Sequence, residues 1–103
     1  MKVTDAPDFS IVIPTYNRPE QLRACLQACA RLDYPSGCFE VIVVDDGGDT
    51  PVDEIITQFR GMLTLRFFRQ ENTGPAAARN RGASEARGEF LAFTDDDCAP
   101  APN

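Results

Sequence analysis

The sequence predicts an α/β domain built on an open, mostly parallel sheet with flanking helices. Four apolar segments typical of strands alternate with three segments whose apolar residues recur at helical spacing. A strand–helix alternation of this kind favours parallel pairing of the strands. The expected strand segments are residues 9–14, 39–47, 62–70 and 89–94.

Each expected helix has its own signal. The first presents one apolar face, formed by Leu22, Cys25, Leu26 and Cys29. Pro19 suits its first turn, and Asn17 is a candidate for its cap. The second repeats this spacing in Val52, Ile55, Ile56 and Phe59. The third, residues 73–88, is alanine-rich and is expected to end at Gly88.

Composition and charge fit a small folded domain and exclude several other classes of protein. The 103 residues are 43% hydrophobic and 25% charged, and the net charge of -6 argues against a nucleic-acid partner. No apolar run reaches the ~18 residues of a membrane span, and no signal peptide is seen, so we expect a cytoplasmic chain. Without histidine or a CxxC pair, a structural zinc site is not expected. Cys25 and Cys29 are predicted to be small core residues.

Polar segments follow three of the four expected strands. Ligands of open parallel sheets bind outside the carboxyl ends of the strands, so these segments are candidates for a shared site. The dinucleotide fingerprint GxGxxG and the phosphate loop GxxxxGK[ST] are both absent. The three segments are residues 14–18, 45–47 and 95–97.

Three consecutive acids follow the segment 89–94, which is expected to be a buried strand. Two like charges ~4 Å apart repel by about 4 kcal/mol at an effective dielectric constant of ~20, so a cation or water must offset them. In an extended chain Asp95 and Asp97 point the same way and Asp96 points the other way. Such carboxylates suit Mg²⁺ or Mn²⁺, with phosphates as further ligands. A solvated acidic turn is the alternative.

Four segments together resemble a known family: SIVIPTYNR, FEVIVVDDGG, NTGPAAARNRGASEARG and EFLAFTDDDCAP. Their order and spacing resemble those of nucleotide-sugar-dependent glycosyltransferases with the Rossmann-like GT-A fold, and most closely the inverting enzymes of family 2. The resemblance covers residues 9–100. It implies that residues 1–8 are an N-terminal extension. Residues 9–103 would then be the N-terminal nucleotide-sugar-binding part of a domain, truncated after its fourth strand.

The resemblance also implies roles for individual residues. By this resemblance, Asp46 would accept a hydrogen bond from a ring N–H of the base, and Arg79 would face the phosphates. Thr15 and Tyr16 would contact base or ribose. The DxD motif would hold the metal through Asp97, with Asp95 on the ribose or on a metal-bound water. The nucleotide would be bound by Pro14, Thr15, Tyr16, Asn17, Arg18, Asp45, Asp46, Arg79, Asp95 and Asp96.

Each role has a structural alternative. Asp45 and Asp46 could serve only as turn or cap residues, and Tyr16 could pack on the first helix. Arg79 could be a surface residue that pairs with Glu85 or another acid. The glycines that follow Asp46 are expected to permit the turn.

The implied function is transfer of a sugar from a nucleoside-diphosphate sugar, with UDP favoured, to a saccharide, lipid or protein acceptor. Inversion would be assisted by Mn²⁺ or Mg²⁺ and needs a carboxylate base, which is expected beyond Asn103. The chain alone is therefore expected to be inactive, and uncovered apolar surface leaves self-association open. A non-catalytic nucleotide-binding or scaffolding module is one alternative. A nucleotidyltransferase is another, but only Arg18 offers a basic group where that class needs a basic glycine-rich loop.

Overall fold

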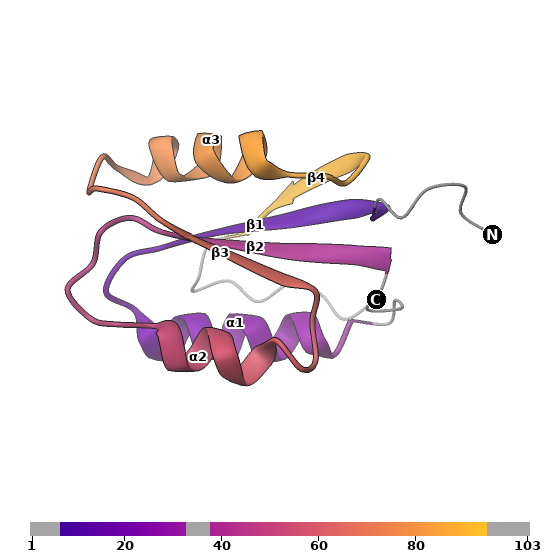
Figure 1. Ribbon diagram of the computed structural model, residues 1–103, viewed down its shortest axis with the longest axis horizontal. Helices are drawn as coiled ribbons and strands as arrows, with labels where there is room; N and C mark the ends of the chain where they lie inside the picture. The colour runs from indigo at the N-terminus through magenta and orange to yellow at the C-terminus, as the bar shows by residue number, and fades with distance from the viewer. Residues whose placement is uncertain (1–6, 33–37, 95–103) are drawn as a thin grey trace.

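The computed structural model describes residues 7–32 and 38–94, which form one parallel sheet with helices on both faces (Figure 1). The strands lie in the order β3-β2-β1-β4, and every pairing is parallel. No helix within these residues is long and apolar enough to cross a membrane. The elements in chain order are β1 (Phe9–Thr15), α1 (Pro19–Ala30), β2 (Phe39–Asp45), α2 (Asp53–Phe59), β3 (Leu65–Arg69), α3 (Pro75–Glu85) and β4 (Phe90–Phe93).

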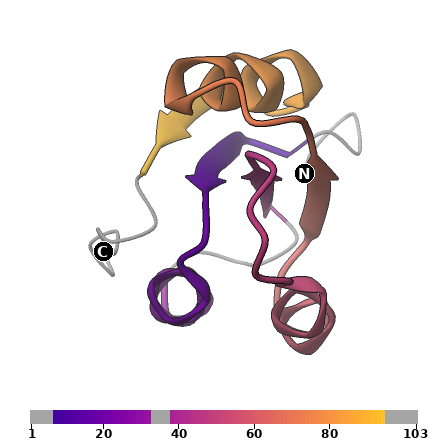
Figure 2. The ribbon, with the colours of Figure 1, turned by 90° about the vertical axis from the view of Figure 1, so that its left-hand side faces the viewer.

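The two faces of the sheet carry cores of different size. Helices α1 and α2 cover one face and α3 covers the other (Figures 1 and 2). Ile11 and Ile13 of β1 belong to the larger core, which includes α1 and α2. The intervening Val12 meets α3, because a Cβ atom built on Gly82 would lie 2.3 Å from its Cγ1. Successive side chains of β1 thus point to opposite faces of the sheet, toward α1 and α2 or toward α3. The absence of a side chain at Gly82 lets α3 approach the strand.

The expected apolar face of α1 is confirmed. Its buried residues are Leu22, Cys25, Leu26 and Cys29. Cys25 and Cys29 are free thiols in the core, and a hydrogen bond between the two thiols together with burial raises the pKa of Cys29. Pro19 occupies the first turn as expected, but the predicted cap was wrong. Arg18 is the N-cap residue, and Asn17 instead accepts a hydrogen bond from the Thr50 N–H at 3.0 Å.

The predicted end of α3 at Gly88 was also wrong. The helix ends at Glu85, and Ala86 follows it in an extended conformation. Gly88 instead allows a close approach of two backbones, since a Cβ atom there would lie 2.5 Å from the carbonyl carbon of Phe9. Its N–H donates to Ser10 Oγ at 2.9 Å, so the turn between α3 and β4 crosses closely over the start of β1.

A buried carboxylate, Glu40 in β2, holds this turn in place. Glu40 is 1% exposed and accepts hydrogen bonds from Ser10 Oγ at 2.6 Å and from the Arg87 N–H at 2.7 Å. The guanidinium of Arg66 in β3 lies 3.3 Å away and also donates to the main-chain oxygen of Glu85. Burial acts to raise the pKa of Glu40, but these hydrogen bonds outweigh it and hold the pKa below its ordinary value.

The fourth strand was predicted correctly, but its predicted burial was wrong. All four residues of β4 are exposed, including Phe90 at 67% and Phe93 at 50%. The reason is that neither hydrophobic core of the described residues includes a side chain of β4, which pairs with β1 at the edge of the sheet.

Candidate functional site

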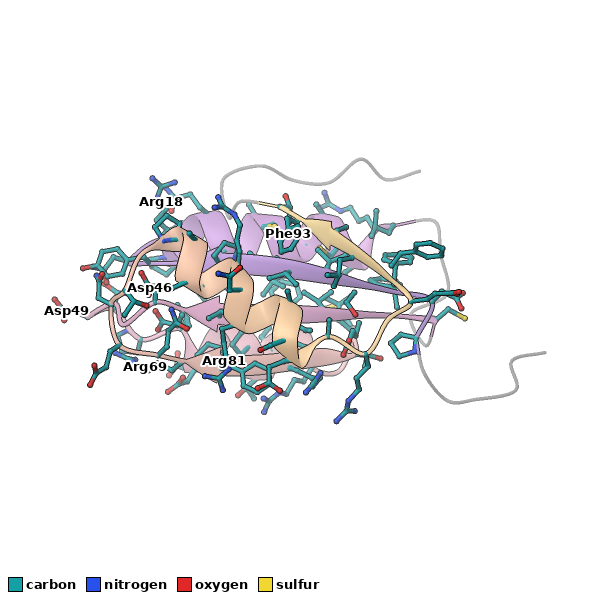
Figure 3. The ribbon with its side chains drawn as sticks, turned by 90° about the horizontal axis from the view of Figure 1, so that it is seen from above. Arg18, Asp46, Asp49, Arg69, Arg81 and Phe93 are labelled. Atoms are coloured by element: carbon teal, nitrogen blue, oxygen red, sulfur yellow. The ribbon has the colours of Figure 1, made fainter. Side chains whose placement is uncertain are left out.

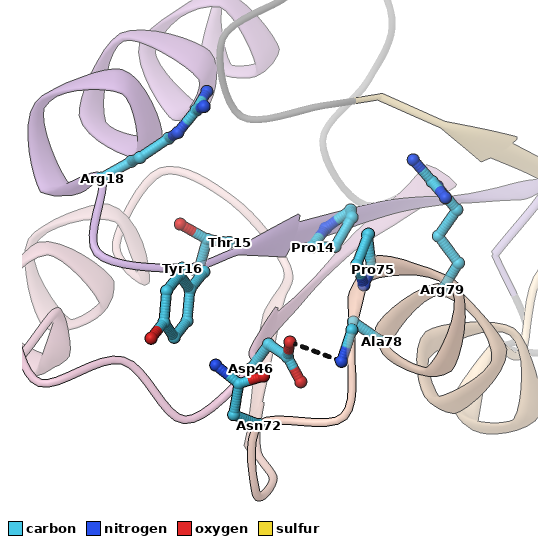
Figure 4. A pocket seen from close by; sticks show the side chains of 10 residues that line it. Pro14, Thr15, Tyr16, Arg18, Asp46, Asn72, Pro75, Ala78 and Arg79 are labelled. Carbon is cyan, nitrogen blue, oxygen red and sulfur yellow. Dashed lines mark hydrogen bonds between the residues drawn. The ribbon is translucent and has the colours of Figure 1, made fainter.

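A pocket of about 480 Å³ opens at the carboxyl end of the sheet (Figure 4). Its walls come from the end of β1, the residue after β2, the loop after β3 and the first two turns of α3. This volume lies in the range of small-molecule sites, and its place is where open parallel sheets bind ligands. The lining residues are Pro14, Thr15, Tyr16, Arg18, Asp46, Asn72, Gly74, Pro75, Ala78 and Arg79.

Asp46 is the buried acid of this pocket and is only 5% exposed. Its Oδ1 accepts hydrogen bonds from Gln70 Nε2 at 2.9 Å and from the Thr73 N–H at 3.0 Å. Its Oδ2 accepts one from the Gly74 N–H at 2.9 Å, drawn as the dashed line in Figure 4. Oδ1 thus takes two of these three donors and Oδ2 takes one, so Oδ2, called the open oxygen below, keeps more acceptor capacity for a ligand.

The charge on Asp46 is fixed by the same contacts. Burial acts to raise the pKa of this carboxyl group, but hydrogen bonds from the N–H and the hydroxyl group of Thr73, from Gln70 and from Gly74 outweigh it and hold the pKa below its ordinary value of 3.8. Asp46 is therefore ionised near neutral pH and can only accept hydrogen bonds. It is suited to meet a donor group of a ligand.

Asp45, the neighbouring acid, lies behind the pocket and does not line it. It is 1% exposed, and its Oδ1 accepts a hydrogen bond from the Gly48 N–H at 3.1 Å. Its Oδ2 lies 3.5 Å from Arg69 Nη1, while Arg69 Nη2 donates to the main-chain oxygen of Gly48 at 2.6 Å. Asp45 and Arg69 thus fix the loop after β2. Figure 3 shows Arg69 at the same end of the molecule as Asp46 and Arg18, with Asp49 pointing outward.

The two glycines after Asp46 do more than permit a turn. Gly47 has a φ of 79°, and a Cβ atom there would lie 2.7 Å from the main-chain nitrogen of Asn72. A Cβ atom on Gly48 would lie 2.6 Å from Asn17 Oδ1. The loops after β1, β2 and β3 therefore pack against one another at distances that only glycine allows.

Most of the predicted site residues of the described chain meet in this pocket. Tyr16 is 45% exposed and lines the pocket, so it is not a core residue of α1. Arg79 lines it as well, and Glu85, one of the acids considered as its partner, pairs with Arg66 and Arg81. Asn17 and Asp45 lie beside the pocket. Asp95, Asp96 and Asp97 lie outside the described residues, within which no group of three acids, histidines or cysteines could hold a metal.

Four lining residues were not predicted: Asn72, Gly74, Pro75 and Ala78. All belong to the segment NTGPAAARN, of which only Arg79 was expected to face a ligand. The sequence did carry a signal, the pair Gly74-Pro75, because proline favours the first turn of a helix. In the structure Gly74 has a φ of 103° and Pro75 begins α3, so the pair marks an abrupt helix start.

The model of the family described as "Glycosyl transferase family 2" matches residues 10–103. The chain belongs to this family. Its fold matches solved GT-A glycosyltransferases. One is TarS 1–349 of S. aureus, with a TM-score of 0.87 and 33% identity, covering 92% of this chain and 29% of that chain. Another is the mannosyltransferase PcManGT of Pyrobaculum calidifontis, with a TM-score of 0.85 and 28% identity, covering 94% and 30%. The predicted family and fold class are confirmed.

Curated family 2 relatives are much longer than this chain. Glycosyltransferase AglE of Haloferax volcanii is 38% identical over 91% of the chain, which is 32% of AglE. The chondroitin synthase of Escherichia coli is 40% identical over 91% of the chain, which is 14% of that synthase. The chain therefore spans about a third of AglE and less of the synthase. TarS has been solved with UDP and with UDP-GlcNAc, and PcManGT with GDP-Man and Mn²⁺.

Proposed function

We propose that the pocket binds a nucleoside-diphosphate sugar and that the chain is the donor-binding part of an inverting glycosyltransferase. The observation that carries the proposal is Asp46, an ionised and nearly buried acid in a pocket of about 480 Å³, whose Oδ2 takes only one of the three hydrogen bonds from Gln70, Thr73 and Gly74. The nucleotide and nucleotide-sugar complexes of the two solved relatives support it.

Each lining group has a chemical role in this proposal. Asp46 accepts a hydrogen bond from a ring N–H of the base, a donor that uracil has and cytosine lacks, and UDP is the nucleotide we favour. Tyr16 offers an aromatic face to base or ribose. Arg79 and Arg18 supply positive charge for the phosphates, with the planar donor groups that suit phosphate oxygens. Pro14 and Thr15 form the wall beneath the nucleotide, and Asn17 and Asp45 hold the surrounding loops.

Asp95 and Asp97 are proposed to hold the metal, and Asp96 is proposed to contact the nucleotide. These acids suit Mn²⁺ or Mg²⁺, which would offset charge on the departing diphosphate. The strand that precedes them runs toward the pocket, because β4 is parallel to β1 and the Thr94 N–H donates to the main-chain oxygen of Val12 at 3.1 Å. The Mn²⁺ complex of PcManGT also supports a divalent ion.

The catalytic base is proposed to lie outside this chain. Among the described residues, Asp46 is the one acid that lines the pocket, and three of its acceptor positions are filled. We therefore propose that residues 9–103 bind the donor, that residues 1–8 are an extension, and that the chain alone does not transfer sugar. A saccharide, lipid or protein remains open as the acceptor.

Metal dependence of nucleotide binding tests this proposal. We expect Mn²⁺ to strengthen UDP binding to this chain by about tenfold or more, because an ion shared with the phosphates adds charge-assisted contacts. Asp97→Ala should remove that gain in a calorimetric titration, whereas Asp49→Ala, at an exposed site of the loop after β2, should keep it. Equal UDP affinity of the unmodified chain with and without Mn²⁺ would contradict the proposed metal site.

A further inference from the structure

Gln70 contacts Asp46 from behind the pocket. It follows β3 directly, and its main-chain N–H donates to the Asp45 oxygen at 3.0 Å, which fixes its backbone to β2. Its side-chain Nε2 donates to Asp46 Oδ1 at 2.9 Å and to Thr73 Oγ1 at 3.0 Å. An ionised carboxylate accepts only, so the NH₂ end of the amide must face Asp46, and both of its hydrogens are used.

This contact decides which oxygen of Asp46 is open. Oδ1 takes two donors, from Gln70 and Thr73, while Oδ2 takes one, from Gly74. Oδ2, which takes fewer of these donors, is therefore the open oxygen. Gln70 is absent from the lining of the pocket, so any effect it has on a ligand passes through Asp46.

We propose that Gln70 is a positioning residue that makes Asp46 present Oδ2 as an acceptor and so sets the base preference of the pocket. The proposal rests on the nucleotide-binding function proposed above. Uracil carries a ring N–H where cytosine carries a bare ring nitrogen, although UDP and CDP share ribose and diphosphate. A carboxylate that can only accept therefore favours UDP over CDP, provided that its open oxygen is held toward the base.

Two substitutions of similar size remove this control in different ways. Gln70→Glu places a second carboxylate against Asp46, and the pair must then share a proton or move apart. Gln70→Met keeps the length of the side chain but removes both donors. Gln27→Glu makes the same chemical change as the first substitution at an exposed position on α1, outside the pocket, and serves as the matched control.

The test is the ratio of the CDP and UDP dissociation constants, measured by calorimetry at one fixed Mn²⁺ concentration. We expect the unmodified chain and Gln27→Glu to prefer UDP. Both Gln70 variants should lower the ratio by about tenfold, mainly by weakening UDP, because only UDP uses the open oxygen. If Gln70→Glu does not fold, Gln70→Met gives the same readout.

A purely structural role gives a different result. If the Gln70 variants weaken UDP and CDP by the same factor, or leave both unchanged, Gln70 does not set the preference and the inference is overturned. If the unmodified chain binds UDP and CDP equally, Asp46 does not contact the base as proposed. The role proposed for Gln70 is then wrong as well. A ratio that falls only in the Gln70 variants supports both.

Discussion

Exchanging Asp46 for asparagine should weaken UDP binding by about 2 to 3 kcal/mol, or roughly 30- to 140-fold. The amide replaces one acceptor oxygen by an NH₂ group, yet every neighbour of this carboxylate is a donor: Gln70, Thr73 and Gly74. The base N–H would therefore lose its acceptor or displace one of these contacts. Inorganic diphosphate does not reach the base contact, so its affinity should stay within about twofold.

The control for this prediction uses Asp49, three residues after Asp46 in the chain. Asp49→Asn makes the same chemical change at an exposed site in the loop after β2, and it should bind UDP as the unmodified chain does. Calorimetric titration of both variants with UDP and with diphosphate makes the comparison. A parallel loss of UDP and diphosphate in Asp46→Asn would mean that Asp46 only holds the loop and does not read the base.

Replacing Glu40 with glutamine should lower the free energy of unfolding by about 3 kcal/mol, the largest stability effect that we expect. Glu40 accepts from Ser10 and the Arg87 N–H at Oε2 and from Arg66 at Oε1, whereas an amide accepts at one oxygen only. Glutamine also leaves the Arg66 guanidinium without its buried counter-charge. Urea unfolding measures the loss. Glu71→Gln, at an exposed position, should stay within about 0.5 kcal/mol of the unmodified chain.

The stability loss in Glu40→Gln should also depend on pH in a defined direction. The folded state holds the pKa of Glu40 below its ordinary value of 4.5, so its ionised form stabilises the fold above that pH. This contribution is lost as the pH falls through the lowered pKa. The difference between the unmodified chain and Glu40→Gln should therefore shrink under acid conditions. A difference that grows on acidification would contradict the role of the carboxylate.

The pattern of strands and helices could be predicted because it depends on local apolar spacing. The spacing of Cys25 and Cys29 indicated one buried face of α1, and the structure buries both. The burial of β4, the cap of α1 and the end of α3 could not be predicted in the same way. They depend on what packs against Phe90, on the Thr50 N–H that occupies Asn17, and on the crossing of Gly88 over β1.

The residues of the candidate site, too, could be predicted only in part from the sequence. Tyr16, Asp46 and Arg79 could be assigned because the ends of parallel strands and the helix starts after them meet at one edge. Gln70 could not, because its amide has no distinctive local pattern. Its role depends on a contact with Asp46, a residue 24 positions away in the chain.

Backbone-amide NMR of this chain, titrated with UDP and Mg²⁺, tests the placement of the nucleotide most directly. The N–H groups of Thr73 and Gly74 donate to Asp46, so their resonances report on any ligand at that carboxylate. We predict that the largest shift changes occur at Thr73, Gly74 and Tyr16. A second cavity of about 560 Å³ lies at the starts of α1 and α2, between Arg23 and Glu54. Largest changes around that cavity, with Thr73 and Gly74 unmoved, would contradict a nucleotide site at Asp46.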